Sequence, residues 1–456
     1  MLECVSPIGG EVFAERPTLS VDAAVAAVER ARAAQSEWAA RELTERIALV
    51  CAGVEQLRAM NDEMVPELAH MMGRPVRYGG EIGGVEERTF YMAEIAEAAL
   101  APIVVEDSGA FERRILREAQ GVVLVVSPWN YPYMTAINTV APALIAGNTV
   151  LLKGATQTLL AGERLAKAFH KAGVPEDVFQ NVFLDHATTA ELIARRSFGF
   201  VNFTGSVSGG RAIEKAAAGT FTGLGLELGG KDPGYVMDDA NLDNAAETLI
   251  DGAMFNSGQC CCGIERIFVH RKHFDGFVER AKAIVESYVL GNPLEQETTL
   301  GPMAHRRFAD LVREQTAEAI ADGARTVIDV SRFADDDGTY LAPQILVDVN
   351  QNMRVMREES FGPVVGIMAV DSDDEAIAAM NDSDFGLTAS LWTDDEQRAA
   401  AIGARIETGT VFMNRCDYLD PGLCWTGCKD TGRGGALSPI GFHNVTRPKS
   451  YHLKKS

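Results

Sequence analysis

Three consecutive cysteines, Cys260, Cys261 and Cys262, lie in the stretch FNSGQCCCGI and are the first feature that could carry chemistry. The chain has 8 cysteines in 456 residues, so three in a row are unexpected. Such thiols can bind a metal, form disulfides, pack in a core or supply a nucleophile, because a thiolate is reactive near neutral pH.

Metal and disulfide roles are disfavoured by spacing. Adjacent cysteines are poor joint ligands for one zinc ion, whose ligands are usually about two to four residues apart. Few, irregularly spaced cysteines fit a reducing cytoplasm, so we expect no metal site and no disulfides. In a locally extended segment, Cys260 and Cys262 point to one side and Cys261 to the other. Periodicity alone does not say which side faces a substrate.

Polar residues also follow several predicted strands. Asn130 follows the run GVVLVV, and Lys153 follows TVLL. Gly205 and Ser206 follow FGFVNF, and Glu227 ends GLGLEL. Ligands of α/β proteins gather at the carboxyl ends of strands, so these side chains suit an anionic cofactor and a polar reaction.

The strands alternate with helices of about a dozen residues, which predicts parallel βαβ units. The alternation runs from residue 121 to 231 and begins again after 231, as far as GTVFMN at 409–414. Apolar residues at helical spacing predict two helices in 20–59 and further helix in 61–100. We expect an α/β fold with two domains joined near residue 231. Neither glycine-rich stretch fits the usual dinucleotide fingerprint.

Composition excludes some partners. The formal net charge of −22 repels phosphate backbones and anionic lipid, so we expect neither nucleic acid nor a membrane surface as a partner. The N-terminus has no basic and apolar pattern of a secretory signal, and no apolar run is long enough to span a bilayer. We expect a cytoplasmic protein.

Six motifs together resemble the aldehyde dehydrogenase superfamily. They occur in the family's order over nearly the whole chain, and the interval from Glu227 to Cys261 matches the family. The motifs are SPWNYP (127–132), FTGS (203–206), ELGGK (227–231), GQCC (258–261), ESFGP (359–363) and GTVFMN (409–414).

The resemblance implies a covalent mechanism that oxidises an aldehyde to a carboxylic acid. Cys261 is the expected nucleophile, and Asn130 with the Cys261 backbone N–H is the expected oxyanion hole. Glu227 is the expected general base for hydrolysis of the thioester. Relatives that pass the acyl group to coenzyme A usually lack this carboxylate, so hydrolysis is the expected outcome.

The resemblance also implies NAD or NADP as the cofactor. Many NAD-using members read K-P-S-E where this chain has Lys153-Gly154-Ala155-Thr156. Thr156 lacks the negative charge that repels a 2′-phosphate, so we expect NADP to be tolerated or preferred. The expected cofactor residues are Trp129, Lys153, Thr156, Gly205, Ser206, Glu359 and Phe361.

The substrate pocket expected from the family register is moderately polar. This lining favours short polar or carboxylated aldehydes such as succinate semialdehyde. Arg415 could pair with a carboxylate or point to solvent. The expected pocket residues are Tyr131, Met134, Thr135, Asn138, Cys260, Cys262, Asp417 and Leu419.

The family implies two Rossmann-like, three-layer α/β domains and a small β arm for oligomerisation. We expect a dinucleotide-binding domain at 1–100 and 120–231, a catalytic domain at 232–430, and an arm from 101–119 and 431–456. The arm implies a homodimer or homotetramer, although the tail could be an edge strand or a solvated end.

Two alternatives remain open. One is a thiol acyl-transferase or esterase without redox chemistry, which would use Cys261 and Glu227. The other is a catalytically silent structural protein on the same fold, which predicts an eroded catalytic set.

Overall fold

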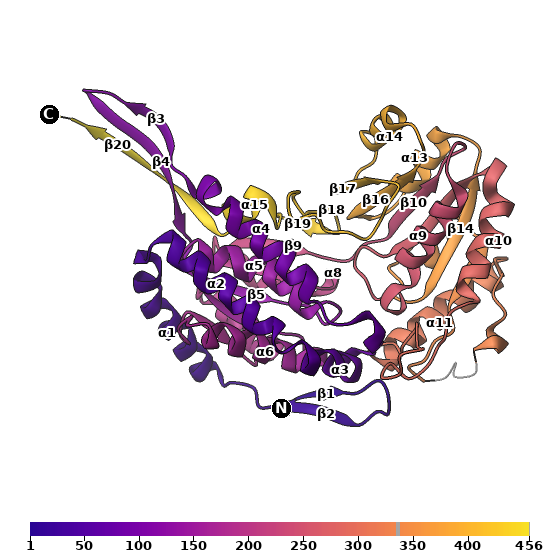
Figure 1. Ribbon diagram of the computed structural model, residues 1–456, viewed down its shortest axis with the longest axis horizontal. Helices are drawn as coiled ribbons and strands as arrows, with labels where there is room; N and C mark the ends of the chain where they lie inside the picture. Colours follow the sequence, from indigo (N-terminus) through magenta and orange to yellow (C-terminus); the bar gives the residue numbers. More distant parts are fainter. Residues whose placement is uncertain (334–337, 456) are drawn as a thin grey trace.

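The computed structural model describes residues 1–333 and 338–455, which form two α/β halves and a projecting arm (Figure 1). In Figure 1 the first half lies on the left and the second half on the right, and the arm extends to the upper left. The predicted α/β class with two Rossmann-like sheets is confirmed.

The centre of the first half is a six-stranded sheet of, in order, β19 (Gly432–Arg433), β9 (Gly223–Glu227), β8 (Phe200–Thr204), β5 (Val122–Val126), β6 (Thr149–Lys153) and β7 (Phe179–Asn181). Strands β5 to β9 are parallel, and β19 pairs antiparallel with β9. β5 and β6 are buried along their whole length, as expected for central strands covered on both faces.

Helices cover both faces of this sheet. One face packs on α1 (Val21–Ala40), α7 (His186–Ala194) and α8 (Val207–Ala217). The other packs on α2 (Leu43–Arg58), α3 (Asn61–Met72), α4 (Ile82–Leu100), α5 (Pro132–Ile145) and α6 (Leu159–Lys171). The two helices predicted in 20–59 are thus α1 and α2. Shorter elements are β1 (Leu2–Val5), β2 (Val12–Arg16), η1 (Val76–Tyr78) and η2 (Thr156–Thr158).

The second half has a seven-stranded sheet of, in order, β12 (Arg325–Thr326), β13 (Gln344–Val347), β14 (Val364–Val370), β11 (Ile264–His270), β10 (Asp232–Val236), β16 (Thr388–Trp392) and β17 (Thr410–Met413). Only the β12 pairing is antiparallel in this sheet, within the described residues.

Two separate apolar layers make this half three-layered as well. One layer involves α9 (Leu242–Met254) and α10 (Phe274–Val285), and the other α11 (Arg306–Ala321), α13 (Asp373–Asn381) and α14 (Glu396–Gly403). Short elements are η3 (Phe255–Gly258), η4 (Arg271–His273), η5 (Val330–Arg332), α12 (Arg354–Arg357), β15 (Phe385–Gly386) and β18 (Cys428–Lys429).

The carboxyl ends of β8 and β9 meet the amino ends of β10, β11 and β14. Gly230, between β9 and β10, donates its backbone N–H to Glu359 Oε1 at 3.1 Å. A Cβ on Gly230 would lie 2.6 Å from the Cys261 carbonyl oxygen, so this close approach requires glycine. The segments 227–231, 258–262 and 359–361 therefore converge between the two sheets.

The arm is a three-stranded antiparallel sheet of β3 (Ile103–Asp107), β4 (Phe111–Ala119) and β20 (Thr446–Lys454). The C-terminal tail is thus a paired strand, not a solvated end. Within the segment 431–456 that was predicted for the arm, β19 pairs with β9 of the first sheet. α15 (Ser438–Asn444) likewise packs on α4 and α5, and its Phe442 is buried in the core of the first half.

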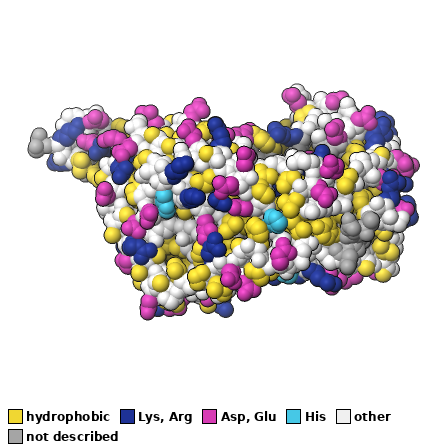
Figure 2. Space-filling view, turned by 60° about the horizontal axis from the view of Figure 1, so that its bottom comes forward, with side chains coloured by type: hydrophobic (Ala, Val, Ile, Leu, Met, Phe, Trp, Pro, Cys, Tyr) yellow, Lys and Arg dark blue, Asp and Glu magenta, His cyan; other side chains and the backbone are white. Residues whose placement is uncertain are grey.

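Charges and apolar surfaces fit an acidic globular protein. Acidic and basic side chains are interspersed over the face shown in Figure 2. No helix among residues 1–333 and 338–455 is both long and apolar enough to cross a membrane.

Candidate active site

The strand ends of the first sheet bring together the polar residues singled out in the sequence. Asn130 follows β5, Lys153 ends β6, Ser206 follows β8 and Glu227 ends β9. Because β5 lies between β6 and β8, the strand order reverses at this point, which is where α/β sheets bind ligands.

The three cysteines follow a turn with an uncommon backbone conformation. Asn256 and Ser257 have φ of 53° and 55°, and Gly258 has φ of 72°. Non-glycine residues hold such angles only when their surroundings fix them. Asn256 Nδ2 donates to the Gln259 carbonyl oxygen at 3.2 Å, and Gln259 Oε1 accepts from the Ala304 backbone N–H at 2.8 Å. These bonds fix the loop from both sides.

The outer two thiols share one acceptor. Cys260 and Cys262 are buried, and their sulfur atoms lie 3.6 Å apart. Both donate to Asp417 Oδ1, at 3.1 Å and 2.9 Å. Cys261 is half-buried and is therefore the most accessible of the three. Cys261 and Cys262 lie in a turn, in which the Gly263 backbone N–H donates to the Cys260 carbonyl oxygen at 3.2 Å. The segment is therefore not extended, and the alternation predicted for an extended segment does not apply.

The thiols also differ in acidity. The neighbouring side chains of Cys260 and Cys262 lower the pKa of Cys261 to about 5. The contact with Cys261 raises the pKa of Cys260, and the contact with Cys260 raises that of Cys262. The middle cysteine is therefore the most acidic of the three thiols.

The sequence spacing predicts that three adjacent cysteines are poor joint ligands for one metal ion. In the structure, however, their three sulfur atoms lie close together. They lie within 4.8 Å of one another, close enough to approach one ion. The expectation that no metal is needed stays a prediction.

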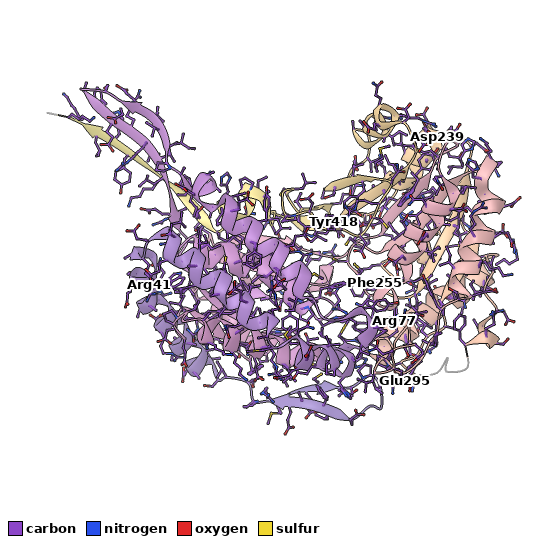
Figure 3. The ribbon with its side chains drawn as sticks, viewed as in Figure 1. Arg41, Arg77, Asp239, Phe255, Glu295 and Tyr418 are labelled. Carbon is purple, nitrogen blue, oxygen red and sulfur yellow. The ribbon has the colours of Figure 1, made fainter. Side chains whose placement is uncertain are left out.

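A cavity of about 240 Å³ opens over Cys261. Phe255 and Tyr418, which line it, lie between the two halves in Figure 3. The structure places every residue predicted for the substrate pocket along this cavity: Tyr131, Met134, Thr135, Asn138, Cys260, Cys262, Asp417 and Leu419. It adds Gly84, Glu87, Arg88, Thr204, Glu227, Leu228, Phe255, Leu387, Tyr418 and Trp425.

Glu227 lies in the same cavity as Cys261 and is 9% exposed. Burial raises the pKa of its carboxyl to about 7, although Thr204 and Arg88 act in the opposite direction. Thr204 Oγ1 donates to Glu227 Oε2 at 3.4 Å. A carboxyl group with a pKa near neutrality can accept and return a proton under ordinary conditions.

Asn130 is held by a buried ion pair that the sequence did not indicate. Its side-chain Nδ2 donates to the Gln259 carbonyl oxygen at 3.2 Å, and its own carbonyl accepts from Arg74 Nη2. Arg74 and Glu81 form an ion pair at 3.0 Å, and Glu81 also accepts the Met134 backbone N–H at 2.8 Å. The ion pair therefore ties the Asn130 turn to the start of α5.

Arg88 is a further functional candidate that the sequence analysis missed. It lies on the buried face of α4 with Val85 and Met92, at positions where helical spacing calls for apolar residues. A cation within an apolar stripe was the available signal. The guanidinium of Arg415, the other arginine that the sequence indicates, lies 3.8 Å from the centre of the Tyr418 ring. Arg415 is not among the residues that line the cavity.

Lys153 is suited to an anionic or hydroxyl-rich ligand. It is 6% exposed, and its Nζ enters no hydrogen bond or ion pair among the described residues. Burial lowers its pKa, and Asp185 acts in the opposite direction. Thr156 lies in η2 just beyond it and is half-buried. A buried cation without a partner is costly, so a ligand here would be stabilising.

The turn after β8 leads directly into α8. Ser206 caps this helix and accepts the Gly209 backbone N–H at 3.2 Å. A Cβ on Gly205 would lie 2.8 Å from the Phe203 ring, so the turn has no room for a larger residue. The N-terminal end of α8 favours negative charge.

Glu359 and Phe361 lie on a loop anchored by Glu265. Glu265 accepts the backbone N–H groups of Ser360 and Phe361, at 2.8 Å and 2.9 Å. Burial raises the pKa of Glu359 to about 8. Phe361 packs edge-on against Trp129, with ring centres 5.5 Å apart. Two of the residues expected to hold the cofactor are therefore in contact across the two halves.

The fold and the site define an α/β protein with a cysteine and a carboxyl group in a cavity between two doubly wound sheets. Residues 1–451 match the model of the aldehyde dehydrogenase family, and the chain belongs to this family. The resemblance seen in the sequence is thus confirmed.

Relatives cover nearly the whole chain. This chain is 33% identical over 446 residues to a succinate-semialdehyde dehydrogenase (NADP+) of Deinococcus radiodurans, and the match covers 98% of this chain and 93% of that protein. It is 31% identical over 459 residues to a lactaldehyde dehydrogenase of Escherichia coli, covering 99% and 95%.

A solved structure of an NADP-dependent glyceraldehyde-3-phosphate dehydrogenase from Bacillus halodurans, in complex with NADP, is 32% identical. It superimposes with a TM-score of 0.92 over 100% of this chain and 96% of that chain. The protein is therefore an NAD(P)-dependent aldehyde dehydrogenase that oxidises an aldehyde to the carboxylic acid.

Proposed function

We propose that Cys261, Glu227 and Asn130 carry out this oxidation. The observation that carries the proposal is the shared cavity, in which the one accessible thiol of the triplet lies together with a carboxyl group of near-neutral pKa. Cys261 Sγ attacks the aldehyde carbon and forms a tetrahedral alkoxide. Asn130 Nδ2, with its second N–H, and the Cys261 backbone N–H donate hydrogen bonds to this oxygen.

Collapse of the alkoxide expels the hydrogen of the former aldehyde carbon and leaves an acyl group on Cys261. NAD(P)+ bound beside the cavity would supply the acceptor for this hydrogen, which leaves with the electron pair of its C–H bond. Glu227 then removes a proton from a water molecule, the resulting hydroxide attacks the thioester carbon, and Cys261 leaves as a thiolate. The product is the free carboxylic acid.

The test compares Cys261→Ala with Cys51→Ser, a control on α2 away from the cavity. Formation of reduced cofactor is followed with a panel of short aldehydes and both cofactors. We expect Cys261→Ala to abolish it and Cys51→Ser to retain it. Retained oxidation in Cys261→Ala contradicts the assignment of the nucleophile, and ester hydrolysis without cofactor reduction supports a non-redox acyl transfer.

We propose that the residues Trp129, Lys153, Thr156, Gly205, Ser206, Glu359 and Phe361 hold the cofactor, and that NADP is used at least as well as NAD. Thr156 offers a hydroxyl donor where a carboxylate would repel a 2′-phosphate. Thr156→Glu should therefore raise the KM for NADP by about tenfold or more and leave the KM for NAD within about threefold. A parallel change for both cofactors contradicts this role of Thr156.

We propose that short polar aldehydes are the substrates and that the protein is a homodimer or a homotetramer. Polar groups at Thr135, Asn138 and Asp417 support the first statement. The projecting β3-β4-β20 sheet supports the second, because an isolated arm of three strands leaves its apolar side chains in water.

A further inference from the structure

Arg88 is a buried cation within the cavity. Its side chain comes from α4, is 7% exposed overall, and lines the cavity that holds Cys261 and Glu227. No ion pair among residues 1–333 and 338–455 includes it. A buried charge without an ion-pair partner is destabilising, so an anionic ligand that paired with Arg88 would be stabilising.

The hydrogen bonds of Arg88 leave one edge of its guanidinium free. Nη1 donates to the Met134 carbonyl oxygen at 2.9 Å and to Asn138 Oδ1 at 3.3 Å. Nε is buried without a partner, and no hydrogen bond described for this part of the chain involves Nη2. The Nε–Nη2 edge is one that binds a carboxylate through two parallel hydrogen bonds.

Asn138 leaves a second donor unpaired beside Arg88. Its side chain is 1% exposed, and its Oδ1 accepts from Arg88. Its Nδ2 is buried and has no partner. Arg88 Nε and Asn138 Nδ2 therefore both lack an acceptor among the described residues, although both side chains line the same cavity.

The nearby carboxyl groups do not supply that acceptor. Glu81 is bound by Arg74 at 3.0 Å and by two backbone N–H groups. Glu87 is exposed and accepts the Tyr418 hydroxyl. Glu227 accepts from Thr204. Arg88 influences the ionisation of Glu227, so it lies near the reacting groups.

We propose that Arg88 and Asn138 form a subsite for a carboxylate at the far end of the substrate, so that the enzyme prefers short aldehydes that carry a carboxylate. The inference rests on the proposed function of the same cavity and names the substrate class. The carboxylate accepts hydrogen bonds from the free edge of Arg88 and from Asn138 Nδ2, while its aldehyde carbon reaches Cys261. The cavity of about 240 Å³ limits the chain between the two ends to a few carbons.

The test compares succinate semialdehyde with 4-methylpentanal, which has the same shape but replaces the carboxylate with an isopropyl group. We expect kcat/KM to be about a hundredfold higher for succinate semialdehyde. Arg88→Met should lower kcat/KM for succinate semialdehyde by about a hundredfold, mainly through KM, and leave 4-methylpentanal within about threefold. Asn138→Leu should show the same selectivity with a smaller loss, and Arg88→Lys should recover part of it.

The control is Arg58→Met, since Arg58 is an exposed arginine at the end of α2 that pairs with Glu86 of α4. It should leave both substrates unchanged. Equal losses of both substrates in Arg88→Met, or no preference in the wild type, overturn the subsite. Because Arg88 lowers the pKa of Glu227, Arg88→Met should move the midpoint of the pH profile to higher pH for both substrates alike. The two substrates are therefore compared on the high-pH plateau, where a loss confined to succinate semialdehyde supports the subsite and an equal loss of both overturns it.

A second measurement does not depend on turnover. Succinate should slow the alkylation of Cys261 by iodoacetamide in the wild type and in Arg58→Met, but not in Arg88→Met. Protection without any aldehyde oxidation keeps the subsite and contradicts the proposed function. Oxidation without carboxylate preference or protection keeps the proposed function and overturns the subsite.

Discussion

Cys261 and Glu227 share one cavity but lie in opposite electrostatic surroundings. Neighbouring thiols lower the pKa of Cys261, whereas burial raises the pKa of Glu227 to about 7. Near neutral pH the cysteine is therefore ionised for attack, while the glutamate is close to its midpoint. The two groups proposed as nucleophile and base therefore ionise over different pH ranges.

Glu227→Gln should stop the cycle after the first oxidation. The amide cannot accept a proton from water, so the thioester on Cys261 accumulates. We expect a burst of about one reduced cofactor per site, followed by steady turnover at least about a hundredfold slower than in the wild type. Stopped-flow absorbance measures the burst, and mass spectrometry of the acylated chain identifies the intermediate. Full steady turnover in this variant contradicts the role of Glu227.

Thioester hydrolysis should follow the ionisation of Glu227. Below pH 7 the carboxyl is increasingly protonated and cannot act as a base, so the hydrolysis rate falls by about tenfold per pH unit, and above pH 7 it levels off. Thr204→Val removes a hydrogen bond that lowers this pKa, so the midpoint should move to higher pH. Single-turnover hydrolysis of the acyl-enzyme measures both midpoints. An unchanged midpoint in Thr204→Val is the contrary result.

At the scale of elements, the sequence predicts the strands better than the contacts between their ends. Buried runs such as VVLVV and the polar residues that follow them identify β5 and Asn130, because both signals are local. Arg74 and Glu81 are not local in this sense, since their function depends on packing against the Asn130 turn far along the chain. Periodicity could have marked Arg88, but only the cavity shows what it faces.

The loops between the two sheets depend on small residues at their closest approach. A Cβ on Gly229 would lie 2.3 Å from Glu359 Oε1, so Gly229→Ala should displace the loop that carries Glu359. We expect the Kd for reduced cofactor, measured by fluorescence, to rise by about tenfold or more. Gly83→Ala is the control, because nothing lies within 4 Å of its added Cβ. Equal affinities for the two variants contradict a cofactor role for this loop.

At the scale of the molecule, the site residues come from both halves, whereas the arm projects from the first half alone. The cysteine loop and the Glu359 loop come from the second half, while Asn130, Lys153 and Glu227 come from the first. The cavity therefore exists only when the two halves are packed together. The arm lies away from this contact and projects from the first half in Figure 1.

The arm presents consecutive apolar side chains to solvent. Ile103, Val104 and Val105 on β3 are 54%, 65% and 56% exposed. Apolar side chains gathered on a projecting sheet are typical of a surface that is buried in an assembly. Strand β3 is also an edge of this sheet, so its backbone can pair with another chain.

Val104→Glu should therefore weaken the assembly. A charge buried at an interface without a partner is strongly destabilising, so we expect the wild type to sediment as a dimer or tetramer and Val104→Glu to shift towards the monomer. Val289→Glu, at an exposed valine 45% accessible and outside the arm, is the matched control and should sediment as the wild type does. A monomeric wild type, or a variant that remains fully assembled, shows that β3 does not form the interface. Because β4 pairs with both β20 and β3 within one chain, the arm should stay folded in the monomer. The amide hydrogens of β4 and β20 should remain protected from exchange, while those on the outer edge of β3 should lose protection.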